Sequence, residues 1–192
     1  MPSMHFQSLF ASFALFLAVS LAASSPAFAA LAEELSEVTR LHHAGQSQAA
    51  LERADKYLAT KPKDAQMRFL KAVVLADIGR RADAVALLQQ LVQDYPELPE
   101  PHNNLAALYA ATGDYGKARA ELEDSLRLDP NYSTAHENLG DVFLMLAGQS
   151  YAQALKLEPS NTSVPRKLAL VRQIVLPGNA VASAPAAASS AH

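Results

Sequence analysis

Apolar residues recur along the middle of the chain at the spacing of amphipathic helices. In the runs 105–109 and 118–126, small or apolar residues repeat every three or four positions, with charged residues between them. This spacing places the apolar side chains on one face of a helix. Alanine and leucine dominate the apolar residues, while β-branched and aromatic residues are sparse, which favours helix over sheet. We therefore expect an all-α protein.

The helical pattern repeats at a constant interval along the chain, the interval that separates Pro62 from Pro96. We call this interval the repeat period. The repeated positions hold proline (Pro62, Pro96, Pro130), glycine (Gly45, Gly79, Gly113), alanine (Ala50, Ala84, Ala118) and a large apolar residue (Leu41, Leu75, Tyr109, Phe143). The glycine allows the chain to reverse between two helices, and the alanine lets those helices cross closely. The proline ends the second helix. The sequence thus predicts a stack of helix pairs.

This pattern resembles the tetratricopeptide repeat (TPR). The clearest unit is 100–132, where the matches are Asn104-Leu105-Ala106, Tyr109, Gly113-Asp114-Tyr115, Ala118 and Asp129-Pro130. The usual tryptophan of the first helix is replaced by His102. The resemblance implies a right-handed TPR solenoid over residues 30–159, with repeats near 31–64, 65–98 and 99–132 and a shortened one at 133–159. The unit 31–64 is the most degenerate.

The shortened unit leaves two interpretations open. The chain could turn at residues 147–150, leaving a short second helix from Ser150 to Leu157. Alternatively, one helix could run from Thr134 to Leu157, at a cost of about 1 kcal/mol for its interior glycine. Its apolar stripe would be Leu139, Phe143, Leu146, Ser150, Ala154 and Leu157.

An amphipathic helix is predicted over residues 160–176, with Leu168, Val171 and either Ile174 or Val175 on its apolar side. We expect this helix to cover the open end of the solenoid. Its only charges are Arg166, Lys167 and Arg172, so a helix that binds a partner or a membrane surface is the alternative.

Both ends of the chain differ in composition from the repeats. The N-terminal segment 1–29 contains no Asp, Glu, Lys or Arg and includes an apolar stretch, Leu9–Ala23, which is too short for a comfortable membrane span. Pro26 and the small-x-small pattern Ala27–Ala29 indicate a signal peptide cleaved after Ala29, although the usual basic residues are missing. An uncleaved anchor is the alternative. Residues 177–192 form an uncharged Ala/Ser/Pro tail that we expect to be disordered, or else to dock onto a partner.

Charge and motifs narrow the function. A net charge of −3 gives no field for nucleic acid, and the absence of cysteine excludes disulfides and thiolate metal sites. His42 and His43 are adjacent and diverge on a helix, while His102 and His136 occupy a packing position. Phosphate loops and hydrolase or zinc-protease motifs are missing. We expect no catalysis, no cofactor, no metal and no integral membrane span after signal cleavage.

The resemblance implies a concave groove lined by the first helix of each repeat. The predicted peptide-binding residues are Phe69, Val73, Asn103, Asn104, Ala107, Glu137, Asn138 and Asp141, flanked by Leu35, Thr39 and Met145. Asn104 and Asn138 are one repeat period apart and should stack. Their amides could grip the backbone of an extended peptide, or they could simply tie neighbouring repeats together. The carboxylate clamp of some TPR domains is absent, because Leu35, Thr39, Glu100 and Asn104 occupy its positions.

We therefore predict a non-catalytic scaffold in the bacterial periplasm that binds an envelope protein or an extended peptide. The segment AHENLGDVF also resembles small exported TPR proteins of Gram-negative bacteria. Two alternatives are an accessory subunit of a peptidoglycan enzyme and a self-assembling structural protein, for instance a homodimer.

Overall fold

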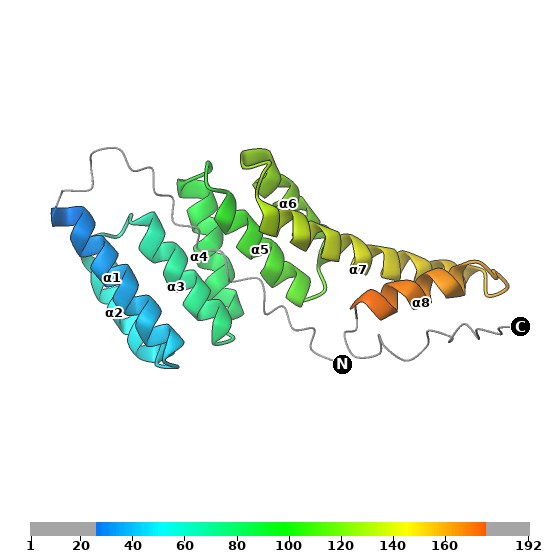
Figure 1. The fold of residues 1–192 in the computed structure, drawn as a ribbon, viewed down its shortest axis with the longest axis horizontal. Helices are drawn as coiled ribbons and strands as arrows, with labels where there is room; N and C mark the ends of the chain where they lie inside the picture. The colour runs from blue at the N-terminus through cyan, green and yellow to red at the C-terminus, as the bar shows by residue number, and fades with distance from the viewer. Residues whose placement is uncertain (1–25, 176–192) are drawn as a thin grey trace, which may run out of the picture. The chain divides into compact units, whose positions relative to one another are not determined.

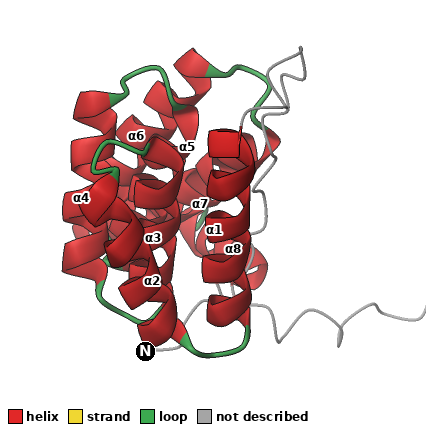
Figure 2. Ribbon diagram, turned by 90° about the vertical axis from the view of Figure 1, so that its left-hand side faces the viewer, coloured by secondary structure: helices red, strands yellow, loops and turns green. Residues whose placement is uncertain are grey.

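The computed structural model describes residues 26–175, and every regular element in that range is a helix (Figures 1 and 2). The helices are α1 (Pro26–His43), α2 (Ser47–Thr60), α3 (Ala65–Asp77), α4 (Arg81–Asp94), α5 (Pro99–Ala111), α6 (Tyr115–Leu128), α7 (Ser133–Leu157) and α8 (Val164–Val175). The predicted all-α class is confirmed.

The predictions for the two ends fall largely outside the described residues. Of the predicted signal peptide, only residues 26–29 are described, and they begin α1. Cleavage after Ala29 would therefore remove the first turn of that helix. The predicted tail at 177–192 lies outside the described range entirely.

The first six helices form three pairs that match the three predicted complete repeats. α1 packs on α2, α3 on α4, and α5 on α6, while α2 and α4 also contact the first helix of the next repeat (Figure 1). The repeated alanines explain the close packing, because Ala50, Ala84 and Ala118 are each 0% exposed. A larger side chain at any of these positions would push the paired helices apart.

The three turns inside the repeats share one geometry. Gly45, Gly79 and Gly113 have φ angles of 73°, 80° and 82°, in the left-handed region that favours glycine. The residue after each glycine donates its backbone N–H to the carbonyl five positions earlier, over 2.9–3.0 Å. This bond is typical of a Schellman motif, which ends one helix and redirects the chain. The regularly spaced glycines are thus a ladder of turns.

The terminal unit is one continuous helix, as the second interpretation proposed. α7 runs through residues 147–150 without a break. The reason lies in the same ladder, since Ala147 occupies the position one repeat period after Gly113. An alanine resists the left-handed conformation that the turn requires, and a helix through this point keeps its hydrogen bonds. Gly148 is one position too late to replace the missing turn residue.

Two compact units make up the described chain, one ending at Leu139 and the other beginning at Gly140, within α7. In the second unit, α8 packs against the later part of α7. The Cβ position at Gly148 lies 3.4 Å from Val171 Cγ1, and the Lys167 ammonium lies 5.9 Å from the centre of the Tyr151 ring. We call residues 140–175 the hairpin. The role of α8 as a cap of the repeats stays a prediction.

The expected apolar sides of the hairpin need correction. Phe143 and Leu157, from the predicted stripe of α7, are 50% and 76% exposed, because no described helix covers them. On α8, Leu168 is buried as predicted, and Val175 rather than Ile174 continues its sheltered side, since Ile174 is 63% exposed.

Candidate protein-binding surface

The first helices of consecutive repeats lie beside one another, which is the arrangement that the predicted surface requires. α1 contacts α3, and α3 contacts α5. Phe69 and Val73 are half-buried on α3, while Asn103, Asn104 and Ala107 are buried on α5. The fold therefore brings these five residues onto neighbouring helices. Peptide binding at these five residues stays a prediction.

The asparagines are paired differently from the prediction. Asn138 Nδ2 donates a hydrogen bond to Asn103 Oδ1 over 2.8 Å, and both side chains are buried. Asn104 Nδ2 instead donates to the backbone carbonyl of Glu100 over 2.9 Å. The expected Asn104–Asn138 stack is thus replaced by a bond between positions that are not equivalent in the repeat. This geometry favours the alternative that these amides tie α7 to the third repeat.

The acidic residues predicted on α7 differ from these amides in exposure. Glu137 and Asp141 are both exposed, and they lie four residues apart on one side of the helix. Glu137 belongs to the same compact unit as α5, whereas Asp141 belongs to the unit that begins at Gly140. Among the predicted binding residues of the repeat unit, Glu137 is therefore the charged and accessible one.

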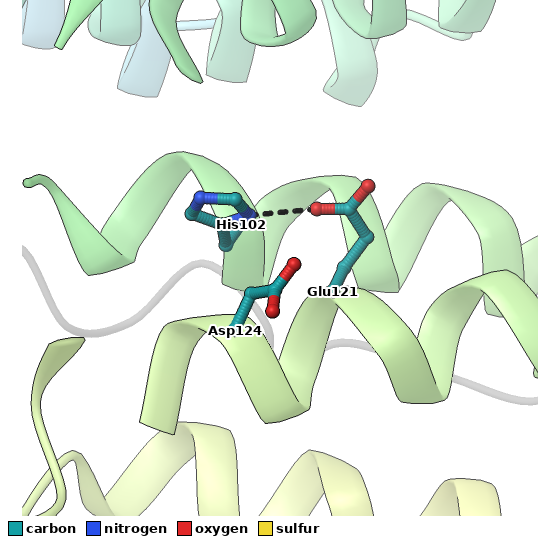
Figure 3. Close-up of side chains that lie close together, drawn as sticks. All are labelled: His102, Glu121 and Asp124. Atoms are coloured by element: carbon teal, nitrogen blue, oxygen red, sulfur yellow. Dashed lines mark hydrogen bonds and ion pairs between the residues drawn. The ribbon is translucent and has the colours of Figure 1, made fainter. Parts of the chain in front are cut away.

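His102 occupies the position of the family tryptophan and makes a polar contact within its own repeat. It is 8% exposed, and its Nδ1 lies 2.7 Å from Glu121 Oε2 on α6 (Figure 3). The sequence predicts a packing position for this side chain, and the contact with Glu121 adds a polar partner from α6. Glu121 thus gives the buried imidazole nitrogen a hydrogen-bond partner.

Asp124 lies beside this pair, and ligand-type atoms of all three side chains lie within 4.8 Å of one another (Figure 3). One imidazole and two carboxylates can bind a divalent metal. However, Glu121 already hydrogen-bonds His102, and Asp124 forms an ion pair with Arg127. The cluster is therefore satisfied by protein groups, and the sequence prediction of no metal stays a prediction.

His42 and His136 also make contacts within the described part of the chain. His42 Nε2 lies 2.6 Å from Asp77 Oδ2, and its Nδ1 lies 3.2 Å from Ser47 Oγ, so the ring links α1 to the end of α3 and the start of α2. His136 is exposed, with its Nε2 2.9 Å from the Pro130 carbonyl. The predicted packing of His136 is wrong.

Two carboxylates act as helix caps. Asp64 accepts a hydrogen bond from the backbone N–H of Met67, and Asp114 accepts one from that of Lys117. The Lys117 side chain also lowers the pKa of Asp114. Asp64 also accepts a hydrogen bond from the Tyr57 hydroxyl. Burial, and secondarily the negative charge of Asp64, raises the pKa of Tyr57 to about 12. These groups stabilise helix ends rather than form a reactive site.

None of the described helices is long and apolar enough to cross a membrane.

The repeats match known protein-family models. Two models described as tetratricopeptide repeat match residues 35–99 and 75–140. A TPR repeat-containing thioredoxin of Arabidopsis thaliana is 37% identical over 68 residues, which are 35% of this chain and 10% of that protein. Cell division cycle protein 27 homolog A, also from Arabidopsis thaliana, is 25% identical over 125 residues, which are 62% of this chain and 17% of that protein. The chain thus spans less than a fifth of either relative.

Solved structures show the same fold. A thermophilic TPR protein from Thermus thermophilus aligns with a TM-score of 0.55 and 24% identity, over 73% of this chain and 80% of its own. The first TPR domain of the human RPAP3 protein aligns with a TM-score of 0.57 and 17% identity, over 61% of this chain and 92% of its own. With its three glycine turns, its buried alanine ladder and these matches, the chain belongs to the tetratricopeptide repeat proteins.

Proposed function

We propose that this protein is a non-catalytic adaptor of the bacterial periplasm, which binds an envelope protein or an extended peptide along its first helices. TPR repeats generally serve as scaffolds for protein–protein interaction. The observation that carries the proposal is the contact of α1 with α3 and of α3 with α5, which aligns three first helices. The partially accessible Phe69 and Val73 offer apolar contacts there.

The polar part of the surface supports recognition by charge more than by amide ladders. Asn103 and Asn138 already satisfy each other, so a ligand would have to break a buried hydrogen bond to use them. Glu137 is exposed and free of that constraint. We infer that the ligand carries a basic or amide-rich segment near Glu137 and an apolar residue near Phe69 and Val73.

Site-specific photo-crosslinking in cells tests the surface. A photoreactive amino acid at Val73 or at Glu137 should capture the same partner, which mass spectrometry then identifies. The matched control carries the same amino acid at Arg119, an exposed position on the second helix α6. Equal capture from Arg119 would place the binding surface elsewhere. The variant Glu137→Lys should reduce capture without unfolding the protein, because this side chain is exposed.

Export is tested separately. Fractionation should recover the protein in the periplasm, and mass spectrometry should find a mature chain that begins at Ala30. The absence of basic residues from the N-terminal segment 1–29 makes this a demanding test. An intact N-terminus in the cytoplasmic fraction would reject the periplasmic assignment and leave the adaptor role standing.

A further inference from the structure

The hairpin carries the most exposed large apolar side chains of the described chain. Six large hydrophobic side chains of the described chain are conspicuously exposed, and the four most exposed belong to residues 140–175. Phe143, Leu157, Leu170 and Ile174 are 50%, 76%, 52% and 63% exposed, against 40% for Ile78 and 39% for Leu128 in the repeats. Clustered exposure of this kind marks a surface that binds something.

The four side chains share one side of the hairpin. Phe143 and Leu157 are separated by about four helical turns, and Leu170 and Ile174 by about one, so each pair lies on one side of its helix. The contacts of Gly148 with Val171 and of Tyr151 with Lys167 show that α7 and α8 are antiparallel. The sides of α7 and α8 that make these contacts face each other. A rotation of about 100° per residue from these contacts then places both pairs on the same side of the hairpin. We call these four residues the terminal face.

α8 leaves this face open. Phe143 is five residues before Gly148, so it points about 140° away from the contact with Val171. A Cβ added at Gly140, one turn before Phe143, would meet no atom within 4 Å. On α8 itself, Val164 and Leu168 are the buried residues, while Leu170 and Ile174 face outward.

The repeat pattern indicates what should cover the terminal face. Phe143 and Gly140 lie one repeat period after Tyr109 and Ala106 of α5. In that repeat, α6 packs on α5, and its buried residues are Ala118, Leu122 and Ser125. α7 has no such second helix, because the chain continues straight through Ala147. The uncovered positions Gly140 and Phe143 therefore fit an amphipathic helix. Its facing residues would be small, large and small, at the spacing of Ala118, Leu122 and Ser125.

Charge selects among possible occupants. The hairpin carries four basic residues and two acidic ones, and all three charges of α8 are basic: Arg166, Lys167 and Arg172. Two hairpins facing each other would bring like charges together, whereas an acidic helix would be attracted. We propose that the terminal face docks an acidic amphipathic helix of a partner protein, which supplies the second helix that the terminal repeat lacks. None of these four residues belongs to the predicted binding residues of the first helices.

A designed peptide tests the proposal on the full mature chain. The probe is a helix of the same length as α6, with alanine, leucine and serine at the spacing of Ala118, Leu122 and Ser125 and glutamate at the outward positions. Its affinity, measured by fluorescence anisotropy, should fall at least about tenfold with lysine in place of glutamate. Phe143→Asp and Ile174→Asp should each weaken binding at least about tenfold, since each replaces an exposed apolar contact of the face by a charge.

Leu128→Asp is the matched control, because Leu128 is an exposed apolar residue of a repeat helix. It should leave the affinity unchanged, and circular dichroism should show all three variants folded. Absence of peptide binding, or binding that ignores both Phe143→Asp and Ile174→Asp, would overturn the proposal. So would a dimer, seen by sedimentation, that Ile174→Asp abolishes. Binding to phosphatidylglycerol vesicles without binding of the peptide would overturn it in favour of a membrane surface.

Discussion

The third repeat and the terminal unit begin with similar repeated residues but fold differently. In the third repeat, Gly113 reverses the chain with a φ of 82°, and α6 returns to cover α5. In the terminal unit, Ala147 occupies the matching position, and α7 continues as a single helix. One residue with a side chain, together with the shortened spacing to Pro159, turns a helix pair into a long helix. The same change uncovers an apolar side that the repeat pattern would otherwise bury.

The largest expected difference between the two regions is the loss of unfolding free energy when a leucine is replaced by alanine. Leu122 is 0% exposed on α6, and Leu157 is 76% exposed on α7. Leu122→Ala should lower the free energy of unfolding by about 2–5 kcal/mol, because it opens a cavity between α5 and α6. Leu157→Ala should change it by less than about 0.5 kcal/mol. Chemical denaturation of both variants measures the difference. A large loss at Leu157 would mean that something covers the terminal face in solution.

The alanine ladder gives a second contrast of slightly smaller size. Ala118 is 0% exposed at the α5–α6 crossing, while Ala152, one repeat period later, is exposed on α7. Ala118→Leu should destabilise the protein by about 1–3 kcal/mol through overpacking. Ala152→Leu should be neutral within about 0.5 kcal/mol. Thermal melts of the two variants compare the same substitution at one repeat position in two surroundings. Equal losses would show that Ala152 is packed against a helix after all.

Alkaline pH should loosen the repeats specifically, since Tyr57 and Tyr132 both lie there. Burial, ahead of nearby carboxylates, raises the pKa of each to about 12 from an ordinary 10.0. The folded state then holds these protons more tightly than the unfolded state. The resulting stability is fully present below pH 10 and is lost as the pH rises toward 12. The loss is at most about 1.4 kcal/mol for each unit of pKa difference, because solvent screens part of the effect.

Denaturant melts across this pH window measure that slope. Tyr57→Phe should reduce the slope, and the double variant with Tyr132→Phe should flatten most of it. The control is Tyr115→Phe, which changes another tyrosine of the repeats. An unchanged slope in the double variant would show that other groups govern alkaline unfolding.

Much of the fold could be predicted from the sequence, because its determinants are local and repeated. The glycines at 45, 79 and 113 fix the turns, and the alanines at 50, 84 and 118 fix the crossings, whatever their neighbours are. The continuous helix was one of two interpretations, and the glycine ladder itself decides between them. Alanine rather than glycine at position 147 is the sequence signal for the continuous helix.

The contacts between helices could not be predicted in the same way. A repeat period identifies equivalent positions, but equivalent positions need not touch. Asn138 contacts Asn103 rather than Asn104, and His102 meets Glu121 on the following helix, α6. Both contacts depend on how the helices cross, which a period does not determine. The exposure of Phe143 was missed for a related reason, since the repeat pattern assumes a second helix that the chain does not form.

The sharpest test of the comparison uses one substitution with opposite expected signs. Gly113→Ala should cost about 1 kcal/mol or more, because a φ of 82° strains any residue with a Cβ. Gly148 lies inside α7, where alanine is the better helix former by about 1 kcal/mol. The new methyl would lie 3.4 Å from Val171 Cγ1, which is an ordinary van der Waals contact. Gly148→Ala should therefore stabilise the hairpin, by somewhat less than the full helix preference.

Hydrogen exchange resolved along α7 should show slower opening around residue 148 in this variant. Faster exchange there would mean that the chain still turns in solution near Ala147–Ser150, so that the terminal unit resembles the third repeat more closely than its helix indicates.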